Sequence, residues 1–213
     1  MLDQKSRYRK RAVKLAAIAA TVVGLGIAGH FGYLHVSGNF HTVIAGELYR
    51  SAQPTPAQLE SYVRDYGMQT VVNLRGRSPK ATWYADEIAT AERLELRHID
   101  FRMSASKELS PEEAEQLVAI LKAAPKPLLI HCQAGSDRSG LVSVLYSHEI
   151  AGIDEETAER QLSVAFGHVG IPYLSSAYAM DKSWEDLEEF YARKGNAALA
   201  MTDLERAPPG VRQ

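Results

Sequence analysis

The chain has 213 residues, of which 46% are hydrophobic and 23% charged, a balance typical of a globular protein. The formal net charge is −2 at pH 7, so no overall positive field attracts nucleic acid, which we do not expect as a partner. The single cysteine excludes an intrachain disulfide framework and a cysteine-rich zinc site. These values favour one folded domain with an appendage.

The appendage is predicted at the N-terminus. Residues 1–14 are rich in lysine and arginine, and the apolar run over 15–36 is interrupted only by His30 and His35. About 20 residues cross a hydrocarbon core, so we expect a transmembrane helix over this run. The basic segment predicts a cytoplasmic N-terminus and a catalytic domain outside the cytoplasm, in the periplasm of a two-membrane bacterium. A signal peptide cleaved after Ala28 is the competing interpretation, and the mature domain would then be secreted to the periplasm.

Strand and helix patterns alternate through the rest of the chain. We expect a linker over 37–43, the folded domain over 44–200 and a flexible tail over 201–213. Thr55 and the Ser110–Glu113 capping box are expected to start two of the helices. The alternation indicates an α/β fold with a central, largely parallel sheet and helices on both faces. Strands are predicted within 44–54 and over 70–74, 96–103 and 127–130, and helices over 56–66, 83–94, 111–124, 141–150, 155–166 and 183–194.

The stretch HCQAGSDRSG over 131–140 carries the chemistry. It lies between an apolar strand pattern and a helical pattern, so it forms a strand–loop–helix turn. Five residues separate Cys132 from Arg138, and a loop of that length can direct its backbone N–H groups at an anion beside the helix N-terminus. The Cys132 thiolate would attack a phosphomonoester to give a phosphocysteine, which water then hydrolyses. Neither a metal nor a cofactor is expected, because the loop amides and Arg138 meet the phosphoryl charge.

The other residues of the motif have supporting roles in this interpretation. Ser139 is placed to donate its hydroxyl to the sulfur, and His131 is expected to orient the loop. Asp137 is expected to pair with a neighbouring basic residue, and His168 to be an ordinary surface or satisfied histidine. A buried structural role for Cys132 would leave Arg138 and the glycines unexplained. The predicted phosphate-binding residues are Gln133, Ala134, Gly135, Ser136, Asp137 and Arg138.

The full string, with its strand and helix, resembles the active-site signature of the cysteine-dependent protein tyrosine phosphatases, in the dual-specificity branch. Residues 48–54 and 71–75 are also similar to segments of these enzymes, particularly bacterial ones, so the resemblance covers roughly 46–170. It implies the dual-specificity phosphatase fold, phosphomonoesterase activity and catalytic roles for Cys132 and Arg138. The implied substrates are proteins that carry phosphotyrosine, phosphoserine or phosphothreonine, or small phosphomonoesters. Lysines that would bind extra phosphates are missing from the loop itself.

One position departs from the family pattern. The resemblance implies an aspartate general acid in the loop before the capping-box helix, but residues 103–106 are not acidic. Glu108 lies in that loop after Lys107, as an acidic residue follows a lysine in plant and fungal atypical dual-specificity phosphatases. Asp100 precedes Cys132 by a family-like separation, but a strand running to 103 would place it about 10 Å below the loop. Glu108 is therefore the first candidate for the general acid and Asp100 the second.

Two functions from different classes follow from these residues. The first is an active, membrane-anchored phosphatase. The second is a pseudophosphatase that binds phosphorylated partners at the membrane with negligible turnover, which the missing aspartate would explain. A rhodanese-like sulfur transferase is a distant third, since it needs no arginine-closed loop of this pattern.

Overall fold

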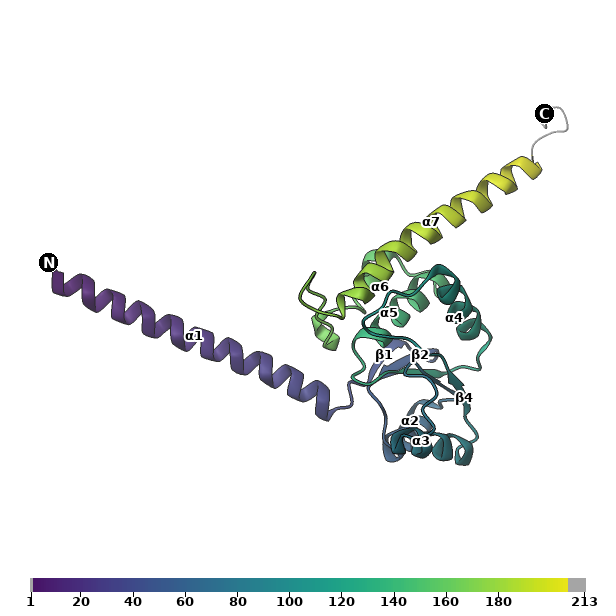
Figure 1. Cartoon of the computed structure of the whole chain (residues 1–213), viewed down its shortest axis with the longest axis horizontal. Helices are drawn as coiled ribbons and strands as arrows, with labels where there is room; N and C mark the ends of the chain where they lie inside the picture. Colours follow the sequence, from purple (N-terminus) through teal and green to yellow (C-terminus); the bar gives the residue numbers. More distant parts are fainter. Residues whose placement is uncertain (1, 207–213) are drawn as a thin grey trace.

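The computed structural model describes the backbone of residues 2–206 and the side chains of residues 8–197. Two long helices, α1 (Leu2–Val36) and α7 (Tyr178–Arg206), extend from the α/β domain in different directions (Figure 1). Among the described residues, one helix is apolar enough to cross a membrane: a window within Tyr8–Val36 has a mean hydropathy of 1.9 and is not buried. A signal sequence has the same properties, so membrane crossing remains a prediction.

The centre of the domain is a five-stranded sheet with the order β1-β2-β5-β3-β4. The β1–β2 pair is antiparallel, whereas the pairs that β5 makes with β2 and β3, and the β3–β4 pair, are parallel. The largely parallel sheet is therefore confirmed, with one antiparallel edge strand. The strands are β1 (His41–Ile44), β2 (Leu48–Ser51), β3 (Thr70–Asn73), β4 (Arg97–Asp100) and β5 (Leu128–His131).

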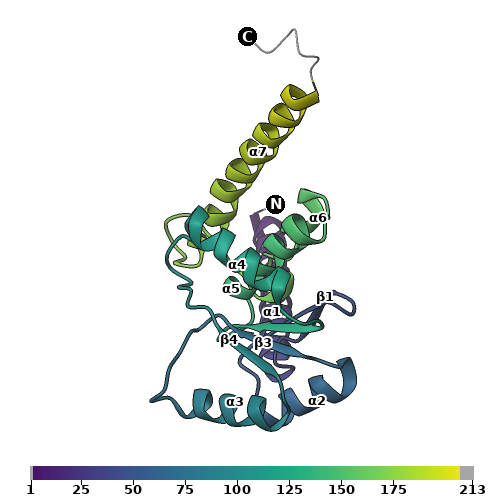
Figure 2. The ribbon, with the colours of Figure 1, turned by 90° about the vertical axis from the view of Figure 1, so that its right-hand side faces the viewer.

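Helices cover both faces of this sheet, as expected. Figure 2 shows α2 (Pro56–Tyr66) and α3 (Thr82–Arg93) on one side and α4 (Pro111–Ala123) and α5 (Asp137–Leu145) on the other. Successive residues of a strand point to opposite faces. In β5, Leu128 and Ile130 accordingly belong to the larger core cluster, while Leu129 belongs to the smaller cluster beneath α2. Burial on both faces makes β5 a rigid support for the residue that follows it.

Local sequence sets two of the helix starts. Thr55 caps α2 in a capping box with Gln58, and Ser110 caps α4 in a capping box with Glu113. Each pair satisfies backbone N–H groups that the first helical turn leaves without partners. Gly67 ends α2 with a φ of 68°, a left-handed conformation that glycine adopts without strain.

Three segments differ from the expectation. The segment 37–43 belongs to the folded domain, because Asn39 is buried and β1 starts at residue 41. The helix expected over 155–166 is shorter, since α6 (Glu155–Glu159) is followed by a turn and a 3₁₀ helix at Val164–Phe166. The helix expected to end at Ile150 is α-helical to Leu145 and continues as a π-helical turn, Tyr146–Ile150.

The C-terminal helix is longer than the expected helix over 183–194. It extends to Arg206, six residues into the segment 201–213 that was expected to be a flexible tail. Alanine, leucine and methionine over 197–201 are strong helix formers and carry the helix onward. Residues 207–213, on which the rest of that expectation falls, lie outside the described residues.

Candidate active site

The loop after β5 brings the predicted nucleophile and its supporting residues together. Cys132 is 2% exposed. The backbone N–H of Gly135 donates to its Sγ at 3.2 Å, and the Oγ of Ser139 lies 3.4 Å from the same sulfur. Both groups can donate to a thiolate, as the sequence predicts for Ser139. Gly135 has a φ of 74°, and a Cβ there would lie 2.5 Å from the Ala52 nitrogen, so the loop requires glycine.

Arg138 closes the loop at the start of α5. Its Nη1 contacts the backbone oxygens of Leu74 and Met103 at the long distances of 3.5 and 3.4 Å. Its buried Nε has no hydrogen-bond partner within the part of the chain that the structure describes. The guanidinium is therefore positioned by weak contacts and retains donors for phosphate oxygens.

Arg50, which the sequence did not single out, supports the loop from beneath. It is fully buried in β2, and its Nη2 donates to the carbonyl oxygens of Gly135 and Ser136 at 2.8 Å each. Burial lowers the pKa of Arg50 to about 10, so the guanidinium stays charged at neutral pH. Because these bonds occupy loop carbonyls, they favour a conformation in which the amides face the anion. The available signal was a single charged residue in an otherwise uncharged short strand.

Asn39 holds the same loop from the segment that follows α1. Its Nδ2 donates to the carbonyl oxygens of Ala134 and Phe166, at 2.9 Å in each case. The side chain is 2% exposed, although its residue was expected to belong to a linker. The Asn39 backbone has a φ of 47°, which asparagine tolerates better than most residues. The segment after α1 is thus part of the active-site scaffold.

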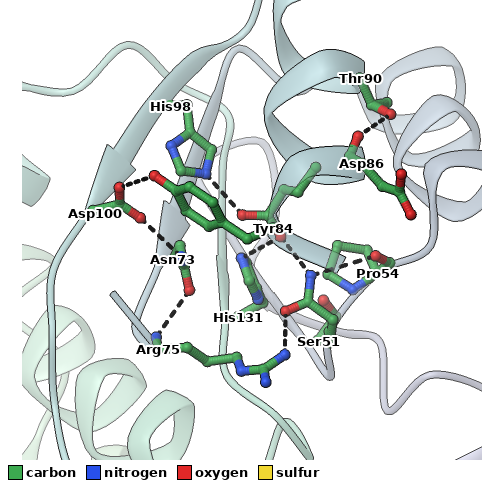
Figure 3. A network of polar contacts seen from close by, with 12 residues as sticks. Ser51, Pro54, Asn73, Arg75, Tyr84, Asp86, Thr90, His98, Asp100 and His131 are labelled. Carbon is green, nitrogen blue, oxygen red and sulfur yellow. Dashed lines mark hydrogen bonds and ion pairs between the residues drawn. The ribbon is translucent and has the colours of Figure 1, made fainter. Parts of the chain in front are cut away.

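His131, which the sequence predicts to orient the loop, contacts a buried carboxylate. Its Nε2 lies 3.0 Å from Glu87 Oε2, while the Nε2 atoms of His98 and Gln53 lie 2.7 and 2.5 Å from the Glu87 oxygens. Burial alone would raise the pKa of Glu87, but these contacts outweigh it and hold the pKa at about 2. A charged Glu87 therefore fixes the residue that precedes Cys132. Figure 3 shows the surrounding polar network.

Asp137 pairs with His168. The two side chains lie 2.8 Å apart, and the other ring nitrogen of His168 lies 2.9 Å from Asp181 in α7. His168 is 3% exposed, so it is a satisfied histidine rather than a surface one. Burial alone would lower its pKa, but the two carboxylates outweigh burial and raise it. This bridge connects the catalytic loop to the C-terminal helix.

A cleft of about 510 Å³ opens beside Arg138. Arg75 also lines it: its Nη1 donates to Gln53 Oε1 at 2.8 Å, and its guanidinium stacks 3.5 Å from the Trp83 ring. Partial burial and the neighbouring Arg138 lower the pKa of Arg75. Neighbouring loops thus add positive charge to that of Arg138, whereas the catalytic loop itself contains no lysine. The cleft is lined by Arg75, Arg102, Met103, Ser104, Ala105, Lys107, Glu108, Leu109, Glu113 and Arg138.

The two candidate general acids have different surroundings. Glu108 is exposed and lines the cleft together with Arg138. Asp100 is the last residue of β4 and is in register with Asn73, which is in register with His131. It is therefore level with the loop, unlike the expected position below it. Two strand spacings, about 10 Å, separate it laterally from β5.

The carboxylate of Asp100 is also occupied. It accepts hydrogen bonds from the Tyr84 hydroxyl at 2.5 Å and from Asn73 Nδ2 at 2.8 Å (Figure 3). Asn73 Oδ1 in turn accepts from the Arg75 backbone N–H at 2.9 Å. Asp100 thereby orients the loop that carries Arg75.

Among the described residues, one group has carboxylate spacing that could hold a metal ion. It comprises Glu155 and Glu159 of α6 and Glu188 of α7. Exposed acidic groups of this kind are common without an ion, and this one is built from helices rather than from the catalytic loop.

The structure combines a buried cysteine after a central parallel strand, a glycine-containing loop and a closing arginine at a helix N-terminus. This is the arrangement implied by the resemblance to cysteine-dependent phosphatases of the dual-specificity type. The family model described as DSP-PTPase phosphatase fused to NAD+ Kinase matches residues 38–170. The match covers more than half of the chain, which therefore belongs to this family. No curated protein matches the sequence.

Solved structures share the fold at low sequence identity. TpbA of P. aeruginosa has a TM-score of 0.52 and 22% identity, over 71% of this chain and 92% of TpbA. Tk-PTP in its active form has a TM-score of 0.54 and 20% identity, over 71% and 97% of the two chains. The core catalytic domain of the PP-IP phosphatase SIW14 from S. cerevisiae has a TM-score of 0.52 and 18% identity, over 74% and 93%.

Proposed function

We propose that the protein is a metal-independent phosphomonoester hydrolase that acts through a phosphocysteine intermediate. The observation that carries the proposal is the placement of Cys132 Sγ between two donors, with the guanidinium of Arg138 at the mouth of the same loop. The Cys132 thiolate attacks phosphorus, an S–P bond forms and the ester P–O bond breaks. Water then attacks the phosphocysteine, which releases inorganic phosphate and restores the thiolate.

The proposed loop ligands act through backbone as well as side chain. The amides of Gln133 to Asp137 would surround the transferring phosphoryl group, and Arg138 would bind two of its oxygens. Ser139 would stabilise the thiolate as it leaves phosphorus. Because the donors are held in place before substrate arrives, they need no reorganisation as charge moves in the transition state.

Glu108 is the proposed general acid. It would protonate the leaving oxygen in the first step and accept the proton of the attacking water in the second. Its exposed position in the cleft beside Arg138 supports this role. Asp100 is the second candidate, but its bonds to Tyr84 and Asn73 favour a positioning role.

Phosphotyrosine, phosphoserine or phosphothreonine in proteins is the proposed substrate class. A cysteine-to-serine form of TpbA has been crystallised in complex with phosphotyrosine, and its fold is similar to this one. An open cleft lined by several basic residues suits a phosphate on a larger molecule. A pseudophosphatase is not favoured, because the family is described as a phosphatase family.

The proposed location is a single-pass membrane protein with residues 1–14 in the cytoplasm and the catalytic domain on the other side. The exposed apolar surface of α1 and the basic residues before it support this orientation. A reporter enzyme that is active only outside the cytoplasm should be active when it is fused after residue 213. Reporter activity confined to the cytoplasm would contradict the orientation, and a mature N-terminus at Gly29 would indicate cleavage.

The proposed activity is tested with the full chain in detergent and p-nitrophenyl phosphate. Cys132→Ser should abolish turnover and retain phosphate binding, because the loop amides remain. Arg138→Ala should reduce both binding and turnover, since it removes two charge-assisted hydrogen bonds. Chelators should have no effect. Turnover by Cys132→Ser, or activity that disappears with a chelator, would refute the mechanism.

A further inference from the structure

The segment between α6 and α7 carries an unusual exposed apolar surface. Residues 161–180 contain no aspartate, glutamate, lysine or arginine. Tyr173 is fully exposed and Leu174 is 84% exposed, next to each other in sequence. Scattered exposed apolar residues are ordinary, but a contiguous, charge-free group of them marks an interaction surface. Its exposed apolar residues are Val164, Val169, Ile171, Tyr173 and Leu174.

This segment packs against the C-terminal end of α1. The Nε2 of His30 lies 3.0 Å from the carbonyl oxygen of Val164. Gly167 faces the same helix, since a Cβ at that position would lie 3.2 Å from Leu34 Cδ1 and 3.9 Å from Phe31 Cε1. In Figure 1 the segment projects from the side of the domain on which α1 leaves it. The start of the segment therefore lies against the last turns of the apolar helix, and residues 169–174 follow it directly in the chain.

We propose that residues 169–174 dock on the bilayer that α1 spans, with Ile171, Tyr173 and Leu174 in its interfacial region. This inference rests on the proposed membrane anchor and is independent of the catalytic activity. Tyrosine beside aliphatic residues is the composition that the headgroup region favours. A bilayer is the occupant because α1, which would cross it, contacts the start of this segment at Val164 and Gly167. Residues 169–174 themselves carry no charged side chain that would oppose contact with lipid.

Docking would attach the domain at two points. Contacts near His30 and Leu34 hold the domain to a single helix, and a second contact with the bilayer would further restrict its tilt. The 3₁₀ helix at the start of the segment contains Phe166, whose carbonyl accepts from Asn39, and Asn39 also holds the catalytic loop. The segment is thereby connected to the catalytic loop through Asn39, in addition to the contact of its own His168 with Asp137.

The test uses the full chain in lipid nanodiscs of phosphatidylcholine and phosphatidylglycerol. Cys132→Ser removes the native thiol, and Tyr173→Cys introduces one at a fully exposed site for an environment-sensitive fluorophore. Leu174→Cys is a second label site, and Lys80→Cys is an exposed control ahead of α3 on the opposite face of the sheet. Lipids with spin-labelled headgroup-proximal chains should quench the labels at 173 and 174 at least about twofold more than the control label.

Water-like emission and control-level quenching at both 173 and 174 would overturn the inference. A blue-shifted emission that spin-labelled lipids do not quench would also overturn it, in favour of a protein partner. A chain that does not co-purify with nanodiscs would overturn the anchor and the docking together. None of these results bears on p-nitrophenyl phosphate hydrolysis, which is measured separately on the chain that retains Cys132.

Discussion

Replacement of Arg50 with methionine tests whether the catalytic loop is held by the strand beneath it. The substitution keeps an unbranched apolar stem but removes the donors to the carbonyl oxygens of Gly135 and Ser136. Hydrogen bonds to charged groups contribute about 1.5–3 kcal/mol each, so two buried ones give about 3–6 kcal/mol. Methionine avoids the cost of burying a guanidinium, which offsets part of this loss. We expect a net destabilisation of about 2–4 kcal/mol.

Thermal unfolding of the detergent-solubilised chain measures this loss. At about 2–4 °C per kcal/mol for a domain of this size, the Tm should fall by about 4–16 °C. Activity should fall as well at temperatures where the variant is folded, because the unbound carbonyls allow the loop amides to turn away from phosphate. Arg97→Met is the matched control, since Arg97 is an exposed arginine in β4, an edge strand of the same sheet. Equal Tm values and equal KM values for the two variants would refute the reasoning.

Three further predictions concern groups around the loop. Glu108→Gln should slow hydrolysis of an alkyl phosphate by about 10²–10⁴-fold and hydrolysis of an aryl phosphate by less. Glu113→Gln, from the same cleft, is the control. Selective loss of alkyl phosphate hydrolysis in Asp100→Asn alone would reverse the assignment of the general acid. Because the pKa of His168 is raised in the folded state, its stabilisation is complete below its ordinary value of 6.5 and is lost as pH rises through the raised value. His168→Gln should therefore lower the Tm more at pH 6 than at pH 9, and a pH-independent difference would contradict the ion-pair bridge. Arg75→Gln should raise KM about tenfold and leave the fold intact, whereas the exposed Arg77→Gln should not change KM.

The parts of the site that sequence predicts are those that local chemistry determines. The apolar run before Cys132 can only be a buried strand, and the spacing to Arg138 fits a loop that ends at a helix N-terminus. The caps at Thr55 and Ser110 are likewise local, because each side chain bonds backbone within its own first turn. Such features need no knowledge of which distant segment packs against them.

The features that sequence did not predict depend on contacts between distant segments. Asp100 was expected below the loop because the alternation of Ile99, Phe101 and Met103 continues past it, and all three residues do pack against the larger core cluster. The strand nevertheless ends at Asp100, and beyond it Phe101 and Met103 donate backbone hydrogen bonds to Asn73 and Leu74. The alternation of apolar residues therefore continues beyond the end of β4. The alternation alone does not determine how β4 is aligned with β3.

Three buried polar side chains from separate parts of the chain hold one loop of seven residues. Arg50 binds two of its carbonyls from β2, Asn39 binds a third from the segment after α1, and His168 binds Asp137 and connects it to α7. Each of these contacts is made between groups of the protein itself. A loop whose amides must all face one anion loses its advantage if they reorient during the reaction. The free energy that orders the loop is therefore supplied by folding, and binding of phosphate does not have to supply it.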